Sequence, residues 1–270
     1  MARHRFTILG CGSSPGVPRI GNDWGACDPN EPKNRRRRAS LLIERFADNG
    51  DKTVVVIDTG PDFREQMLDA GIGWADGVVY THAHADHIHG IDDLRAFVLN
   101  RRRRVPVYMD AVTSVRLREA FGYCFETPAG SSYPPIVTET RIRAGEAFEV
   151  NGPGGSIRLL PFRQIHGDID SLGFRIGDFA YSSDVSALPD EALPHLEGLK
   201  VWIVDALRPA PHPSHLSLSE SMAYIANIKP EHAILTHMHI DLDYVETKAK
   251  LPPHIEPAYD GLTVDLNVMD

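Results

Sequence analysis

Short runs of apolar residues that end abruptly at polar side chains recur along the chain. Runs of this length, rich in β-branched residues, predict strands that are buried on both faces of a sheet. The polar residues at one end of each strand should gather along a single edge of the sheet, where layered α/β proteins usually build their sites. The runs and their polar neighbours are Val54–Ile57 before Asp58, Val78–Tyr80 before Thr81 and His82, Phe179–Tyr181 two serines before Asp184, Val201–Val204 before Asp205, and Ala233–Leu235 before Thr236 and His237.

Segments in which apolar residues follow helical spacing separate the predicted strands. Ser217 and Glu220 form a capping-box pattern at the start of the last such segment, and Asn151–Gly155 is a turn cluster near the middle of the chain. We therefore expect one α/β domain over residues 1–270, made of two similar halves that meet near residue 150. The predicted apolar helix faces are Phe63, Met67 and Ala70; Ile91, Leu94 and Val98; Val112, Val115 and Ala120; and Leu218, Met222, Ile225 and Ala226.

The composition limits the classes of protein to which this chain can belong. Of 270 residues, 42% are hydrophobic and 24% are charged, which is ordinary for a globular chain. No apolar stretch approaches the roughly 18 residues of a transmembrane helix, and the first residues lack the pattern of a signal peptide. The 28 basic and 37 acidic side chains give a formal net charge of −9, which excludes a surface that coats nucleic acid. Three widely spaced cysteines form no disulfide framework, so we expect a cytoplasmic protein without a membrane partner.

The strongest chemical signal is the stretch Thr81–His87, which reads T-H-A-H-A-D-H and follows a predicted strand. In extended backbone, residues two apart point the same way, so His82 and His84 can grip one cation together. If the chain then turns, Asp86 and His87 face a second point a few ångströms away. Mixed imidazole and carboxylate ligands suit zinc, manganese or iron and are poor for calcium or magnesium.

This stretch resembles the H-x-H-x-D-H signature of the metallo-β-lactamase superfamily, whose fold is a four-layer αββα sandwich. The resemblance implies further ligands at His166, Asp184 and His237, each of which follows a predicted strand. By that resemblance one metal takes His82, His84 and His166, the other takes Asp86, His87 and His237, and Asp184 bridges both. Asp58 is expected behind the ligands, where it would orient one of them.

Two metals a few ångströms apart make a bridging hydroxide at neutral pH and stabilise negative charge on the substrate. The reaction class that we expect is therefore hydrolysis, with two divalent transition-metal ions, Zn or Mn, as cofactors.

His215 lies just before a predicted helix N-terminus, which favours an anion, and Asp205 ends the preceding strand. Such a pair can protonate a leaving group or hold a phosphate oxygen. This region and the glycine-rich opening Leu9–Pro18 resemble the phosphodiesterase branch of the superfamily, most closely the PhnP-like enzymes. The resemblance implies catalytic roles for Asp86, Asp205 and His215.

Substrate contacts are predicted for His215 and for two residues near the start of the chain, Ser14 in the glycine-rich opening and Arg35 in the run Arg35–Arg38. Runs such as Arg35–Arg38 and Arg101–Arg104 are otherwise typical of a solvated surface. PhnP-like proteins often carry a structural zinc site near residues 20–30, but Cys27 is the single cysteine there, so we expect no such site. The family leads us to expect a homodimer.

The sequence thus predicts a phosphodiesterase that cleaves small cyclic or nucleotide-like phosphodiesters. The long arm with which tRNase Z proteins hold tRNA has no evident counterpart, so structured nucleic acid is not the expected partner. A thioester, lactone or β-lactam hydrolase of the same fold would not need Asp205 or His215. A di-iron redox protein would have Glu in place of His84, and a metal-dependent binding module would keep the ligands without turnover.

Overall fold

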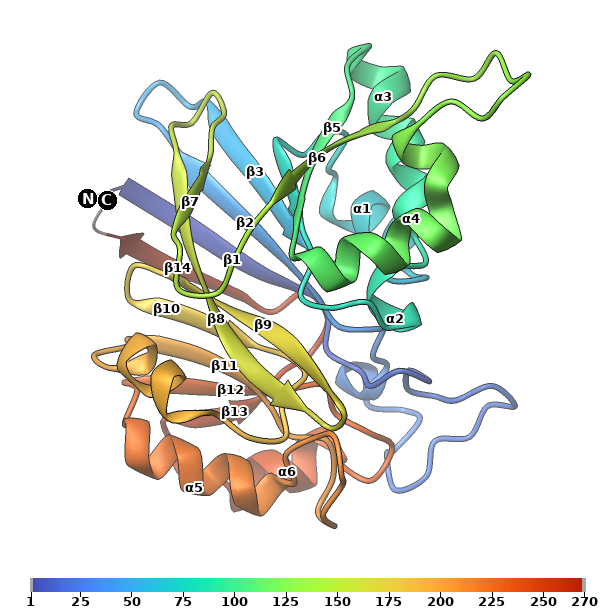
Figure 1. The fold of residues 1–270 in the computed structure, drawn as a ribbon. Coiled ribbons are helices and arrows are strands. Elements are labelled where there is room, and N and C mark those ends of the chain that lie inside the picture. Colours follow the sequence, from blue (N-terminus) through green and yellow to red (C-terminus); the bar gives the residue numbers. More distant parts are fainter. Residues whose placement is uncertain (1, 269–270) are drawn as a thin grey trace.

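Two seven-stranded β-sheets pack face to face with helices on their outer sides in the computed structural model, which describes residues 2–268 (Figure 1). This is the expected four-layer αββα sandwich of the α/β class, and that prediction is confirmed. The first sheet has the order β14-β1-β2-β3-β4-β5-β6. Its strands are β1 (Ala2–Gly10), β2 (Ser40–Phe46), β3 (Lys52–Ile57), β4 (Gly77–Val79), β5 (Val105–Met109), β6 (Val137–Arg141) and β14 (Thr263–Val268).

The second sheet has the order β13-β12-β11-β10-β9-β8-β7. The last strand of the chain, β14, therefore returns to the first sheet, where it pairs with β1 in antiparallel fashion. The strands of the second sheet are β7 (Phe148–Val150), β8 (Ile157–His166), β9 (Ile169–Ile176), β10 (Phe179–Ser182), β11 (Val201–Asp205), β12 (His232–Thr236) and β13 (Ile255–Pro257).

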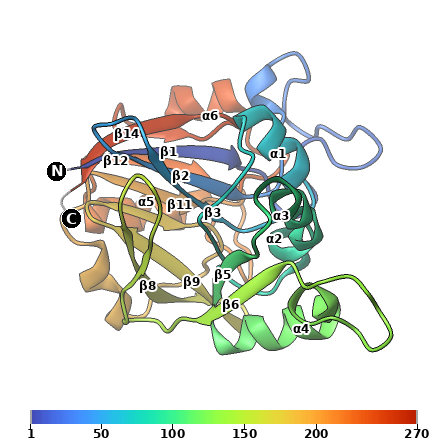
Figure 2. The same cartoon turned by 90° about the horizontal axis from the view of Figure 1, so that it is seen from above.

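Helices cover the outer face of each sheet. Four of them lie together on the side of the first sheet, and the other two lie against the second sheet (Figures 1 and 2). They are α1 (Phe63–Ala70), α2 (Ala85–Ile88), α3 (Arg95–Arg101) and α4 (Ala111–Phe125) on the first sheet, and α5 (Leu218–Ile228) and α6 (Tyr244–Lys250) on the second. Short 3-10 helices are Pro32–Asn34, Ile91–Leu94 and Asp190–Leu196. In the part of the chain that the structure describes, no helix has the length and apolar character needed to cross a membrane.

Alternation along the strands divides the apolar side chains between two cores. In β3, Val55 and Ile57 point into the core between the two sheets, while Val54 and Val56 pack with Phe63 of α1 in the core under the outer helices. Successive side chains of a strand face opposite ways, so a strand buried on both faces must be apolar at every position. The run Val54–Ile57 is continuously apolar because β3 is buried on both faces.

The ends of the parallel strands place the site. Strands β3 to β6 are parallel to one another in the first sheet, and β10 to β13 are parallel in the second. The carboxyl ends of these strands lead into the loops that carry the polar residues singled out above. All five apolar runs fall on strands, with Tyr80 alone lying just past the end of β4, so the strand predictions are confirmed. Ser217 and Glu220 form the expected capping box of α5.

The predicted face of α4 is wrong. Val112 and Val115 are 72% and 56% exposed, and the helix instead buries Thr113, Ser114 and Leu117. The hydroxyl of Ser114 donates to Glu139 of β6, and Leu117, Cys124 and Phe125 pack in the core under the helices, so a different face from the predicted one turns toward the sheet.

Candidate metal centre

Side chains from both sheets converge at the seam between them. The structure brings together all seven of the residues that the sequence singled out as ligands, through loops and strand ends that are far apart in the chain. His82 and His84 follow β4, Asp86 and His87 lie on α2, His166 ends β8, Asp184 follows β10 and His237 follows β12. The short helix α2 supplies the turn that moves Asp86 and His87 away from the extended pair before them.

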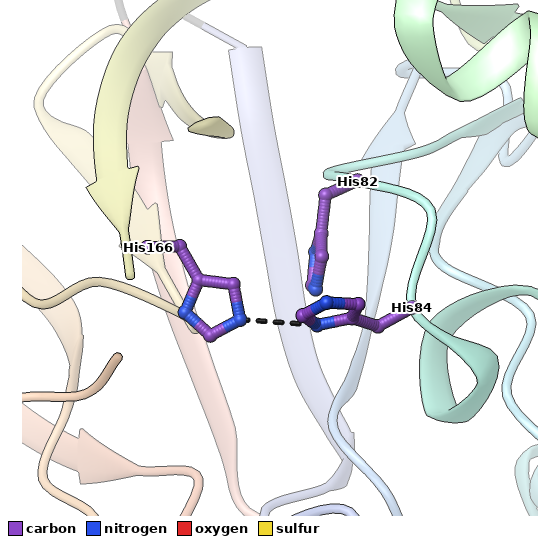
Figure 3. A group of neighbouring side chains, drawn as sticks. All are labelled: His82, His84 and His166. Atoms are coloured by element: carbon purple, nitrogen blue, oxygen red, sulfur yellow. Dashed lines mark hydrogen bonds between the residues drawn. The ribbon is translucent and has the colours of Figure 1, made fainter. Parts of the chain in front are cut away.

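The first group consists of His82, His84 and His166 (Figure 3). One ligand atom from each lies within 4.8 Å of the others. His166 Nε2 is 3.1 Å from His84 Nδ1, and Figure 3 shows the three rings turned toward one another. Three imidazole nitrogens at these separations can bind one divalent ion together.

The second group consists of Asp86, His87 and His237, whose ligand atoms also lie within 4.8 Å of one another. Asp184 stands between the two groups. Its Oδ2 atom is 3.2 Å from His87 Nε2, and its Oδ1 atom is 3.3 Å from His237 Nε2 and 3.9 Å from His166 Nε2. Both oxygens lie near rings of the second group, and Oδ1 also faces His166 of the first, so the carboxylate lies where a bridging ligand would.

Buried polar atoms without partners show that this cluster fits metal ions. His82 Nε2, His87 Nε2, His237 Nε2 and Asp184 Oδ2 are buried and have no hydrogen-bond partner among the described residues. Leaving such atoms unsatisfied costs about 1–3 kcal/mol each, so a cluster of them is rare in a protein without a ligand. Nitrogen and carboxylate oxygen donors in this ratio match zinc or manganese.

Contacts behind the ligands fix which nitrogen of each ring faces the centre. Asp58 Oδ2 lies 2.7 Å from His87 Nδ1, and the same carboxylate accepts hydrogen bonds from the backbone and hydroxyl of Thr81. His166 Nδ1 donates to the carbonyl oxygen of Ser214 at 2.6 Å. These contacts leave Nε2 of His87 and His166 for a metal.

The backbone at the site is held in a sparsely populated region. Asp58 and His237 have φ angles of 64° and 56°, in the left-handed region that favours glycine. Non-glycine residues keep such angles only when the surrounding structure imposes them, and they cluster at functional sites.

Burial also sets the protonation of two of the ligands, His82 and His166. Burial lowers the pKa of His166 to about 4, and it lowers the pKa of His82 well below the usual range. Both rings are therefore neutral at pH 7, which is the form that binds metals.

Asp205 and His215 form a buried pair beside the ligands. His215 Nδ1 lies 2.8 Å from Asp205 Oδ2, and the His215 ring is 4.5 Å from that of His237 and 4.6 Å from that of His166, between ring centroids. Burial lowers the pKa of His215 to about 4, so the ring is neutral at pH 7. With Nδ1 engaged by Asp205, Nε2 is the ring atom left for a bound molecule.

Two predicted substrate contacts make no bond to this cluster. Ser14 and Arg35 are exposed, and no hydrogen bond or ion pair joins either side chain to the ligands within residues 2–268. Their roles stay predictions. His89 packs its ring against Phe121 at 5.7 Å, and His239 bonds Asp241, in keeping with the absence of both histidines from the expected ligand set.

Sequence reasoning missed the contacts made through the backbone. The Ser214 carbonyl that orients His166 has no residue-type signal. A second missed contact is Arg36, which is 1% exposed and donates to the carbonyl oxygens of His239 and Leu242, just beyond His237. Cys27 donates its thiol to the carbonyl oxygen of Ile240 in the same region.

Comparison with known proteins places this site in a family. The family model of the beta-lactamase superfamily domain matches residues 53–238, which span all seven ligand candidates. The protein belongs to the metallo-β-lactamase superfamily. A solved structure described as a new diphosphatase from the PhnP family is 38% identical, with a TM-score of 0.88 over 99% of each chain. Within the metallo-β-lactamase superfamily the chain therefore falls in the PhnP-like branch, as the sequence predicted.

Curated relatives match over shorter shares of their own length. An octanoyltransferase of Porphyromonas gingivalis (strain ATCC BAA-308 / W83) is 33% identical over 96% of this chain and 51% of that protein. A ribonuclease Z of Salinibacter ruber (strain DSM 13855 / M31) is 26% identical over 54% of this chain and 44% of that protein. The chain thus spans about half the length of these relatives, or less, and their names describe longer proteins. The shared part is the fold of a metallo-β-lactamase-type hydrolase.

Proposed function

We propose that this protein is a phosphodiesterase that hydrolyses small, cyclic or nucleotide-like phosphodiesters with two divalent metal ions. The observation that carries the proposal is the buried Asp205–His215 pair, which lies against the ligand rings His166 and His237. Hydrolysis of a thioester, lactone or β-lactam has no evident need for this pair. One relative is described as a diphosphatase of the PhnP family, and another is named ribonuclease Z. Both names describe reactions at phosphorus, which supports phosphorus as the atom attacked.

Seven side chains of this protein would hold the two ions, with His82, His84 and His166 on one side, Asp86, His87 and His237 on the other, and Asp184 between them. When bound, zinc or manganese supplies an activated water and neutralises charge on phosphoryl oxygens.

The protein supplies orientation around that chemistry. Asp58 contacts Nδ1 of His87, and the Ser214 carbonyl contacts Nδ1 of His166. Each contact fixes the ring in the tautomer that leaves Nε2 free to bind a metal. The neighbouring rings also exclude bulk water, since His82, His87 and His237 are at most 2% exposed.

His215 is suited to handle the leaving group. With Nδ1–H engaged by Asp205, Nε2 of the neutral ring carries the lone pair and can accept the proton that the attacking water releases, and Asp205 keeps the ring in one orientation. As the scissile P–O bond breaks, this proton passes from His215 Nε2 to the departing oxygen and neutralises its charge, and Asp205 stabilises the imidazolium between the two transfers.

A panel of phosphate esters on protein reconstituted with zinc or with manganese tests the proposal. We expect turnover of bis(p-nitrophenyl) phosphate and of 2′,3′-cyclic nucleotides, and little turnover of p-nitrophenyl phosphate. His215→Gln should lower kcat by roughly 10²–10⁴-fold with metal content unchanged. Absence of phosphodiester turnover with either metal, or thioester or lactone turnover that is unaffected by His215→Gln, would overturn the proposal.

A further inference from the structure

A stiff loop between β11 and α5 carries two hydrogen-bond donors that the proposed reaction does not use. The segment Arg208–His215 reads R-P-A-P-H-P-S-H, so every second residue from Pro209 to Pro213 is proline. Proline fixes φ, which stiffens the loop, and it has no backbone N–H. Side chains therefore supply most of the hydrogen-bond donors that this loop can offer to a ligand. Backbone hydrogen bonds from Leu207 to Leu216 and from Leu218 to Arg208, both 2.9 Å, close the two ends of the loop.

His212 presents a free N–H beside His215. The two ring centroids are 5.3 Å apart. The backbone N–H of Ser214 donates to His212 Nδ1 at 3.3 Å, so Nδ1 carries the lone pair and Nε2 carries the hydrogen. Nε2 has no hydrogen-bond partner within the described part of the chain and is therefore free to donate to a ligand.

Arg208 adds a permanent positive charge to the same loop. Its Nε donates to the carbonyl oxygen of Ala210 at 3.3 Å, and its Nη2 donates to that of Pro211 at 3.1 Å. The second contact places the guanidinium beside the peptide unit that precedes His212. No carboxylate of residues 2–268 forms an ion pair with it, in a protein whose formal net charge is −9.

The positions of Arg208 and His212 relative to the metal ligands indicate which part of a substrate they could bind. The ligand rings His166 and His237 contact His215, and His215 contacts His212, so the loop lies beyond His215 as seen from the metal ligands. In the reaction proposed above, His215 serves the departing oxygen, and the leaving group must extend past it. A sugar or aryl alcohol has no use for an unpaired guanidinium there, whereas a phosphate does.

We propose that Arg208 and His212 form a subsite for a second phosphate, and that the substrate class is the diphosphate diesters. This inference rests on the proposed function. Water adds its oxygen to the phosphorus held at the ligand cluster, and the bond from that phosphorus to the bridging oxygen breaks. The bridging oxygen leaves with the electron pair as part of the second phosphate. One water is consumed and two phosphate monoesters form, with no other reactant.

Two substrates separate the subsite from the reaction itself. P1,P2-di(adenosine-5′) diphosphate has a phosphate on the leaving group, and bis(p-nitrophenyl) phosphate has none. Arg208→Gln and His212→Phe should each raise KM for the diphosphate by about tenfold or more, the effect of one charge-assisted hydrogen bond. KM for bis(p-nitrophenyl) phosphate should stay within twofold. Arg116→Gln, at an exposed arginine of α4, is the matched control and should change neither value.

Equal losses on both substrates would overturn the subsite, because they would show that the loop only positions His215. Turnover of bis(p-nitrophenyl) phosphate without turnover of the diphosphate would also overturn it and leave the proposed function standing. Failure on both substrates would count against the proposed function instead. Calorimetry with the methylene-bridged analogue of the diphosphate then decides the subsite by itself: weaker binding to Arg208→Gln supports it, and equal binding refutes it.

Discussion

The Nδ1 atom of His166 lies 2.6 Å from the carbonyl oxygen of Ser214, which joins a metal-ligand candidate directly to the loop that carries His215. The residue after His166 is in close contact with Ser214 too, since Gly167 has no room for a Cβ atom beside the Ser214 side chain. Ligand geometry and the position of His215 are therefore coupled through one backbone contact. A change that moves the backbone at Ser214 should therefore alter the metal ligands even where the changed residue touches none of them, whereas a side-chain change that leaves this backbone in place should not.

Pro213→Gly tests this coupling. Glycine frees the backbone one residue before Ser214 and raises the entropy that ordering the loop costs. We expect weaker zinc binding and a lower kcat together, the first measured by competition with a chromogenic chelator. Pro252→Gly, in the segment after α6, offers a comparison outside the loop. A loss of kcat with unchanged zinc affinity would show that the contact does not transmit strain to His166.

Asp58→Asn should weaken metal binding by about 10–100-fold. The amide can still hold His87 but no longer adds negative charge behind the ring that it contacts at 2.7 Å. Titration of the metal-free variant with zinc, followed by calorimetry, measures the change. Asp48→Asn, at an exposed position, serves as the control, and equal affinities in the two variants would contradict the role of Asp58.

Metal removal should lower the melting temperature. The ligands come from the loops of both sheets, so bound ions tie the sheets together and stabilise the folded state by about 4 kcal/mol at a thousand times Kd. Thermal unfolding with and without a chelator gives the comparison. A melting curve that chelation leaves in place would argue against ions at this seam.

Arg36→Met should destabilise the protein by about 3 kcal/mol. The buried guanidinium donates to the carbonyl oxygens of His239 and Leu242, and methionine would leave them only the longer contacts from the Leu242 N–H at 3.3 Å and from the Cys27 thiol at 3.5 Å. Urea unfolding of the metal-free protein measures the change apart from metal loss. Arg35→Met is the matched control, because the side chain of Arg35, next to Arg36 in the sequence, is exposed. This substitution should lower the free energy of unfolding by less than about 0.5 kcal/mol.

Asp260 should make stability depend on pH in the direction opposite to most carboxylates. Burial raises its pKa from the ordinary 3.8 to about 6, against hydrogen bonds from Arg37 that lower it. The folded state then binds more protons than the unfolded state between pH 4 and 6, so this group's contribution is present at low pH and is lost as pH rises. Relative to Asp260→Asn, the free energy of unfolding should fall by about 1 kcal/mol from pH 5 to pH 7, as followed by urea titrations. A difference that rises with pH would mean that the Arg37 contact outweighs burial.

Much of the fold and of the site can be predicted from sequence because both leave marks in residue type. Strand β3 is apolar at Val54 to Ile57 since both of its faces are buried, and the stretch His82 to His87 has a spacing that little besides metal binding explains. The inward face of α4 could not be predicted, since Ser114 faces the sheet to reach Glu139, a partner 25 residues away. The same holds for Ser214, whose contribution is a carbonyl group that every residue carries.

The return of β14 to the first sheet has a practical consequence for dividing the chain. The largely exposed stretch of residues 126–134, between α4 and β6, is a natural place for a cut. The first fragment would carry His82, His84, Asp86 and His87, and the second would carry His166, Asp184 and His237 together with both edge strands of its partner's sheet, β6 and β14. The second fragment would hold every strand of the second sheet, but neither fragment could complete the first sheet or a two-ion centre alone. Hydrolysis would therefore report on their reunion. Fused to two interacting proteins, the pair would act as a complementation sensor that zinc switches on.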